Sequence, residues 1–136
     1  SRGVPEAELG EKYMKKTLAA LLILSASAAQ AGHLDVISFT LNEKCTLGQY
    51  LEVVEDFNEW GSTYGYQTEI AVPSFSDNLE TIYWLGRSAN AEAFGKAHDA
   101  WEAAQTDANS VPARLMQRFG ECGGGNDTRR AYRTFP

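Results

Sequence analysis

Residues 33–61, HLDVISFTLNEKCTLGQYLEVVEDFNEWG, decide the fold because they join a strand directly to a helix. Residues 33–41 are rich in β-branched and aromatic side chains, which is typical of a strand. Thr46 and Gln49 match a capping box, in which each side chain bonds the backbone amide of the other residue at a helix start. Apolar residues then recur at helical spacing, at Leu47, Leu51, Val54, Phe57 and Gly61. This β-α unit is the predicted first half of the fold.

The rest of the chain continues the alternation of strands and helices. The expected elements are strands at 66–75 and 80–87, a helix capped by Asn90, a short helix at 112–119, a flexible loop at 122–127 and a strand at 128–135. The long second helix is expected to turn one stripe inward, formed by Ala91, Phe94, His98, Trp101, Gln105 and Ala108. The order β-α-β-β-α-β predicts an α+β, ferredoxin-like fold, a four-stranded antiparallel sheet with both helices on one face.

Cys45 and Cys122 are the two cysteines of the chain. In the predicted topology, the first strand ends and the last strand begins at the same edge of the sheet. Cys45 follows the first strand and Cys122 precedes the last, so the fold itself brings them together. We therefore expect a disulfide between them and an oxidising compartment. Two thiols without a neighbouring histidine make a poor metal site, so no metal is expected.

Residues 14–31 have the pattern of a secretory signal peptide. A short basic start at Met14–Lys16 precedes an apolar stretch at 17–29, and Ala29-Gln30-Ala31 is the small-x-small pattern of a cleavage site. The apolar stretch is shorter than the roughly 20 residues that a membrane-spanning helix needs. We expect cleavage after Ala31, no membrane attachment afterwards and a periplasmic or secreted protein.

Residues 32–136 are expected to form a single domain, and residues 1–13 are interpreted as an expression remnant or an upstream extension. The chain has a formal net charge of −6, and the acidic excess lies in the part after the signal peptide. Because an acidic surface repels phosphate groups, nucleic acid and anionic membranes are not expected partners.

In element order and size, residues 33–135 resemble the dimeric α/β-barrel group of the ferredoxin-like fold. This group includes antibiotic-biosynthesis-type monooxygenases and haem-degrading monooxygenases. In such proteins two sheets pack face to face across a twofold axis, and a pocket lies between each sheet and its helices. The resemblance therefore implies a homodimer with a pocket for a small molecule.

The segment Phe94-Gly95-Lys96-Ala97-His98 resembles the histidine-bearing helix of the haem-degrading members. Those members also use an asparagine on the first strand, a role that Asn42 would fill only with a shifted register. The position of their tryptophan is held by Ser88, so the resemblance does not imply their activity. We expect no cofactor, and haem bound by His98 is the alternative.

The candidate ligand-binding residues are Tyr50, Trp84, His98 and Trp101. His98 is expected to point inward between aromatic neighbours, with Glu102 one helical turn away to orient its ring. Such an imidazole serves as a general base or an axial ligand, and the aromatic rings suit a flat apolar molecule. The alternative is that these side chains only fill the core. His33 is placed outside the site, at the new N-terminus, and Arg87 is expected in a surface salt bridge or at a ligand carboxylate.

Three functions remain open. The first is an exported homodimer that binds a small apolar molecule between sheet and helices. The second is a monooxygenase-like enzyme with His98 as base or haem ligand. The third is a non-catalytic module whose dimer surface is its function. Catalytic triads, phosphate-binding loops and paired-carboxylate motifs are absent from the sequence, so the pattern does not decide between enzyme and binding protein.

Overall fold

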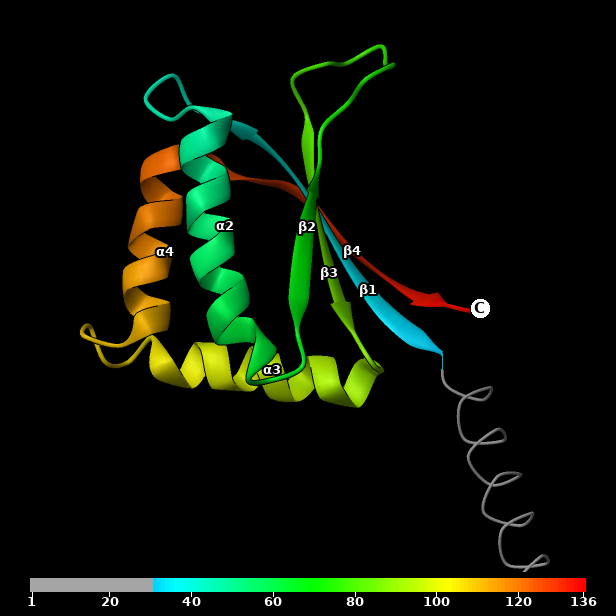
Figure 1. The fold of residues 1–136 in the computed structure, drawn as a ribbon, viewed down its shortest axis with the longest axis vertical. Coiled ribbons are helices and arrows are strands. Elements are labelled where there is room, and N and C mark those ends of the chain that lie inside the picture. Colours follow the sequence, from blue (N-terminus) through cyan, green and yellow to red (C-terminus); the bar gives the residue numbers. More distant parts are fainter. Residues whose placement is uncertain (1–30) are drawn as a thin grey trace, which may run out of the picture. The chain divides into compact units, whose positions relative to one another are not determined.

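The computed structural model describes residues 31–136, and the predicted signal peptide, apart from Ala31, lies outside them. The elements follow the order β1 (Gly32–Leu41), α2 (Leu47–Ser62), β2 (Gln67–Ala71), β3 (Ile82–Ser88), α3 (Ala91–Ala104), α4 (Val111–Cys122) and β4 (Gly123–Thr134) (Figure 1). The predicted alternation is confirmed, with two helices in the second helical position. No helix of this part of the chain is long and apolar enough to cross a membrane.

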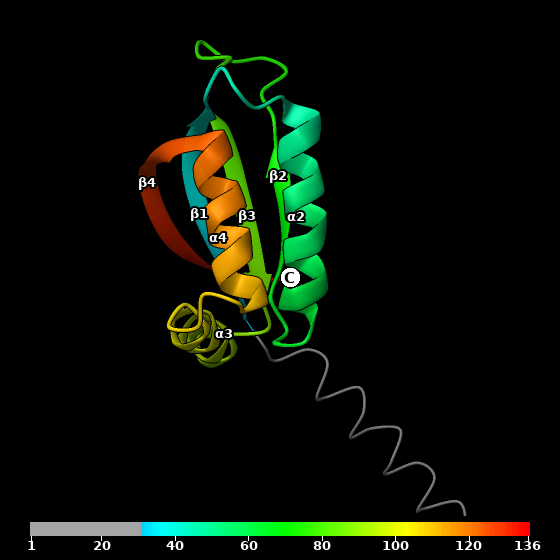
Figure 2. The same cartoon turned by 90° about the vertical axis from the view of Figure 1, so that its left-hand side faces the viewer.

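The strands form one antiparallel sheet in the order β2-β3-β1-β4. β1 lies in the interior between β3 and β4, while β2 and β4 are the edges. The helices lie on one side of this sheet (Figures 1 and 2). The strand order and the one-sided helices are those of a ferredoxin-like α+β protein, which confirms the predicted fold class.

Helix α2 begins at the predicted capping box. The Gln49 amide donates to Thr46 Oγ1 at 3.2 Å, and the Thr46 amide donates to Gln49 Oε1 at 2.9 Å. α2 and α4 run side by side over the sheet, and α3 crosses their ends (Figure 1). α3 was expected to reach residue 108 and to be the main second helix. It ends at Ala104 instead, because Ser110 bonds both the Ala104 carbonyl, at 2.6 Å, and the Ala113 amide, at 3.1 Å, and so starts α4.

The largest differences from the predicted strand boundaries are at the end of β2 and the start of β4. β2 ends at Ala71, before Pro73, which cannot donate a ladder hydrogen bond, and Phe75 lies fully exposed in the following loop. The predicted flexible loop at 122–127 is wrong, because β4 begins at Gly123, which pairs with Leu41. The β1–β4 ladder is irregular on both sides of Phe39, as expected where extra residues are accommodated in one strand.

A disulfide joins Cys45 to Cys122, as predicted, with their Cα atoms 4.8 Å apart. Beside it, the Asn42 amide donates to the Cys122 carbonyl at 2.9 Å, and the Asn42 side chain donates to the Glu121 carbonyl at 2.8 Å. These bonds hold the start of β4 against the end of β1. They explain why a glycine-rich segment at this corner continues directly into a strand.

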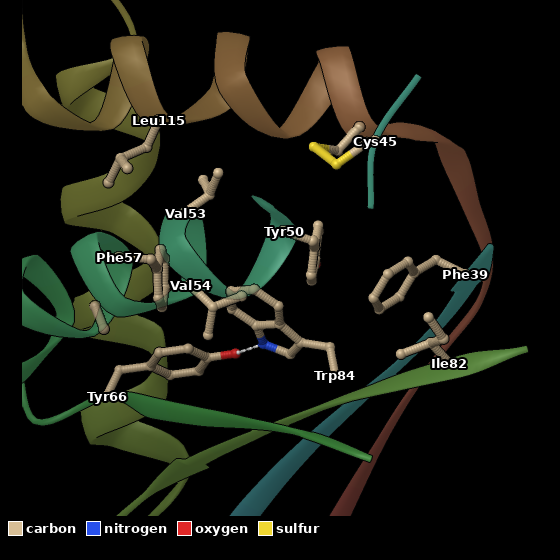
Figure 3. Close-up of a cluster of buried hydrophobic side chains, with 12 residues drawn as sticks. Phe39, Cys45, Tyr50, Val53, Val54, Phe57, Tyr66, Ile82, Trp84 and Leu115 are labelled. Carbon is tan, nitrogen blue, oxygen red and sulfur yellow. Dashed lines mark hydrogen bonds between the residues drawn. A yellow bond between two sulfur atoms is a disulfide. The ribbon is translucent and has the colours of Figure 1, made fainter. Parts of the chain in front are cut away.

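The core lies between the inner face of the sheet and helices α2 and α4 (Figure 3). Because side chains alternate along a strand, Ile37 and Phe39 of β1 point to this face while Val36 points to the other. The main buried side chains are Phe39, Tyr50, Val53, Val54, Phe57, Tyr66, Ile82, Trp84 and Leu115. The opposite face of the sheet is not covered by any element of residues 31–136, as the edge-on view of the sheet shows (Figure 1).

Candidate functional site

A cavity of about 370 Å³ lies between the sheet and the helices. Aromatic side chains from the sheet and from all three helices line it, including Phe57 of α2, Trp84 of β3, Trp101 of α3 and Phe119 of α4. This volume falls within the range of small-molecule pockets, which are mostly apolar with a few polar groups. The fold therefore places a pocket of ligand size inside its aromatic core.

All four residues proposed from the sequence line this cavity: Tyr50, Trp84, His98 and Trp101. Tyr50 and Trp84 are buried, whereas the His98 side chain is 39% exposed. The imidazole faces the cavity as expected, but the expectation that it is buried is wrong. Because α3 crosses the ends of the other helices, its buried position is Ala97 and His98 lies at the rim. There, His98 Nε2 is 3.8 Å from Glu102 Oε1, the neighbour that was expected to orient it.

A chain of hydrogen bonds forms the polar wall of the cavity, with Trp84, Tyr66 and Arg129 lining it and Asp35 behind them. The Trp84 indole donates to the Tyr66 hydroxyl at 2.7 Å, as Figure 3 shows, and Tyr66 donates to Asp35 Oδ2 at 3.1 Å. Arg129 donates two hydrogen bonds to the same carboxylate, from Nε to Oδ1 at 3.1 Å and from Nη2 to Oδ2 at 2.9 Å. Asp35 is only 1% exposed, so a carboxylate lies inside the core with three donors around it.

Strand pairing explains how these groups meet. Asp35 shares the inner face of β1 with Ile37, and Arg129 of β4 lies opposite Ile37, within reach of the carboxylate. Gly86 of β3 lies opposite Asp35, and a Cβ there would collide with the Tyr66 hydroxyl. Because residue 86 has no Cβ, the Tyr66 side chain can lie over the backbone of β3 and reach Asp35.

The electrostatics of this wall keep Tyr66 neutral and Arg129 charged. Burial raises the pKa of Tyr66 well above its ordinary value, and the neighbouring Asp35 carboxylate raises it further. The hydrogen bond from Arg129 to Asp35 raises the pKa of the guanidinium. Tyr66 is consequently a neutral donor, and the Arg129 charge is balanced within the wall rather than offered to a ligand.

Sequence reasoning missed Asp35, Tyr66, Arg129 and the position of His33. His33 was expected at the new N-terminus, outside the secondary-structure elements, but it belongs to β1, is only 8% exposed and stacks on Phe94 with ring centroids 4.4 Å apart. The alternation of side chains along the first strand could have indicated these buried positions. His33 and Asp35 share the alternation of the inward apolar residues of β1, and a buried carboxylate requires a partner.

Two other residues that the sequence analysis considered for a site have structural roles away from the cavity. Arg87 forms the expected surface salt bridge, its Nη2 atom 3.0 Å from Glu69 Oε1. Asn42 does not take the role that the resemblance suggested, because its side chain is used at the disulfide corner. Neither residue lines the cavity.

No family model and no curated protein matches the chain. Among solved structures, the hydroxynitrile lyase from Passiflora edulis is similar with a TM-score of 0.50 at 10% identity, over 79% of this chain and 100% of the lyase. At this identity the similarity concerns the fold alone.

Two further solved structures are described as dimeric ferredoxin-like proteins of unknown function. The one from Bacteroides fragilis has a TM-score of 0.43 at 11% identity and covers 75% of this chain and 95% of its own. The one from Thermobifida fusca has a TM-score of 0.46 at 10% identity and covers 80% of this chain and 94% of its own.

Proposed function

We propose that the protein binds a small, mostly apolar molecule in the cavity between its sheet and its helices. The observation that carries this proposal is the aromatic lining of a 370 Å³ cavity within the core. The cavity opens to solvent at His98, so a small molecule can enter it, and most of its walls are apolar rings. A space that several aromatic rings surround without filling is therefore better explained by a ligand than by core packing.

The polar wall favours a ligand of low net charge. The donors of Trp84 and Tyr66 are already used within the protein, and the Arg129 charge is balanced by Asp35. A charged ligand would lose its hydration without gaining a counter-ion, which is unfavourable in an apolar site. The ligand gains mainly from burial of its apolar surface.

We place the protein in the periplasm or outside the cell. The disulfide between Cys45 and Cys122 supports this location, because such bonds persist in oxidising compartments. The sequence pattern of residues 14–31 supports it independently, since it is that of an export signal.

The proposal includes a homodimer formed through the open face of the sheet. This face carries apolar side chains from three strands, among them Val36, Tyr83, Leu85 and Tyr132. Tyr83 is 41% and Tyr132 47% exposed. An apolar sheet face is normally covered, and a second copy of the same face provides a self-complementary cover.

Fluorescence of the neutral dye N-phenyl-1-naphthylamine tests the binding function, because the dye brightens when it enters an apolar site. We expect saturable binding at one dye per chain. Gly120→Phe should abolish it, because Gly120 lines the cavity and a Cβ there meets no atom within 4 Å. Gly95→Phe is the matched control, a helical glycine with equal space that does not line this cavity. Absence of saturable binding to the wild type would refute the proposal.

A second candidate function is general-base catalysis by His98. The observation in its favour is that His98 lines the cavity while remaining accessible to solvent beside Glu102. Elimination of 5-nitrobenzisoxazole tests it, because a base removes the C3 proton while the N–O bond breaks to give 2-cyano-4-nitrophenolate. If the wild type accelerates the elimination and His98→Gln does not, the result would support this candidate. If the wild type and His98→Gln react at the same rate, His98 is excluded as the base.

The site does not favour haem. Haem carries two propionates that need cationic partners, and Arg129, the one arginine or lysine lining the cavity of the described chain, is bound to Asp35. Glu102 adds a further acidic group at the rim beside His98. The proposed binding function therefore includes no cofactor.

A further inference from the structure

Tyr50 differs from Tyr66 in what its hydroxyl does. Tyr50 is only 5% exposed and lines the cavity, and its hydroxyl makes no hydrogen bond to a side chain of the described residues. The Tyr66 hydroxyl, in contrast, both accepts from Trp84 and donates to Asp35. The Tyr50 hydroxyl is not among the fully buried, unpaired polar atoms of the described chain, so it keeps contact with the space of the cavity.

Packing does not explain the hydroxyl. The Tyr50 ring is held by Phe39 and Phe119, with ring centroids 4.9 and 5.7 Å away. A phenylalanine would make the same ring contacts without bringing a polar atom into the core. The hydroxyl thus adds nothing to the fold that a hydrogen atom would not, and its use must be found in the cavity that Tyr50 lines.

We propose that the Tyr50 hydroxyl anchors the ligand, and that the ligand is an uncharged, flat aromatic molecule bearing a hydroxyl or carbonyl oxygen. This inference rests on the proposed binding function and names the class of molecule bound. A hydroxyl both donates and accepts, so it pairs with either kind of oxygen.

The surroundings of Tyr50 account for the flat and uncharged character of the ligand. The walls around it are rings, including Phe39, Trp84 and Phe119, which stack on planar molecules. Burial raises the pKa of Tyr50, so that the hydroxyl stays neutral and keeps its proton to donate. A carboxylate placed here would find no cation, because Arg129 is already paired with Asp35.

Displacement of bound N-phenyl-1-naphthylamine by matched probes tests the inference. The probes are 2-naphthol, 2-methylnaphthalene, which has the same shape without a polar atom, and 2-naphthoate, which is charged. We expect 2-naphthol to bind roughly 3- to 10-fold more tightly than 2-methylnaphthalene, the gain of one buried hydrogen bond, and 2-naphthoate to bind most weakly. Tyr50→Phe should remove the preference for 2-naphthol while leaving 2-methylnaphthalene affinity and the melting temperature unchanged.

Tyr64→Phe is the matched control, because Tyr64 is 42% exposed and does not line the cavity, and it should keep the preference. Equal affinities for 2-naphthol and 2-methylnaphthalene in the wild type would overturn the anchor role but leave the binding function intact. A loss of both affinities in Tyr50→Phe would also overturn it, since it would show a packing role. Failure of the dye itself to bind would instead overturn the proposed function.

Discussion

Arg129 and Asp35 lie 94 residues apart in the sequence, yet two hydrogen bonds of 2.9 and 3.1 Å join them inside the sheet–helix layer. The pair connects an edge strand to the central strand β1 and stands beside the cavity. Its two members differ in exposure, since the Asp35 side chain is 2% and the Arg129 side chain 47% exposed. The buried partner therefore depends on the half-exposed one for its charge balance.

Replacing Arg129 with methionine should lower the free energy of unfolding by about 2–3 kcal/mol, because it leaves the Asp35 carboxylate buried without its cation. The figure lies below that for a fully buried pair because water reaches Arg129. Chemical denaturation followed by circular dichroism measures it. Arg130→Met is the control, one residue along the same strand and exposed, and should change stability by no more than about 0.5 kcal/mol.

The double variant Asp35→Asn with Arg129→Met separates the charge from the packing. Because it removes both charges, it should be more stable than Arg129→Met alone. If the double variant loses as much stability relative to the wild type as Asp35→Asn and Arg129→Met together, the two residues act independently and the proposed charge pairing is wrong.

Local patterns and topology could be predicted from sequence, but most tertiary polar contacts could not. The capping box of Thr46 and Gln49 is a contact within one helix turn, and the cysteine pairing follows from element order alone. The cavity-lining position of Trp84 follows from strand alternation, as that of Ile37 does.

The wrong predictions have a common physical origin: the features concerned depend on how helices and strands pack against each other, which a local sequence pattern does not contain. The exposure of His98 depends on the angle at which α3 crosses the other helices, and periodicity carries no information on that angle. The contact of Asp35 with Arg129 depends on the β1–β4 register, which the irregular ladder near Phe39 shifts. The strand at Gly123 is held by a disulfide corner that composition describes as a loop.

The stability of the protein should fall in alkaline solution, and Tyr50 and Tyr66 should account for part of the loss. Burial raises the pKa of both hydroxyls above the ordinary value of 10.0, so the folded state keeps protons that the unfolded state releases. Their contribution is present below about pH 10 and is lost as the pH rises from there toward the folded-state pKa values.

Denaturation curves collected between about pH 8 and pH 11 measure this loss. Each tyrosine that ionises only in the unfolded state adds a slope of roughly 1.4 kcal/mol per pH unit above pH 10. Tyr50→Phe should reduce the slope by about one such contribution without removing a hydrogen bond to any side chain of the described residues. An unchanged slope in this variant would mean that the Tyr50 hydroxyl reaches water when the protein is folded.

Removal of the disulfide should destabilise the protein without abolishing its fold. The bond closes a loop of sequence separation 77, for which chain entropy predicts about 4 kcal/mol as an upper value. Denaturation of the wild type with and without a reducing agent, compared with a Cys45→Ala, Cys122→Ala variant, measures it. The variant should be insensitive to the reducing agent, and a wild type that is equally insensitive would indicate that the bond does not form.

The open sheet face should hold two copies of the chain together, and Tyr132→Glu should separate them. Tyr132 is 47% exposed on that face, opposite Leu34 in the β1–β4 ladder, so a carboxylate there would be buried against its own copy in a dimer. Sedimentation velocity should show a dimer for the wild type and a monomer for the variant. Leu51→Glu is the matched control, because Leu51 is 43% exposed on α2, away from the sheet, and it should remain dimeric. A monomeric wild type at micromolar concentration would refute the pairing, and equal dissociation by both variants would place the interface elsewhere.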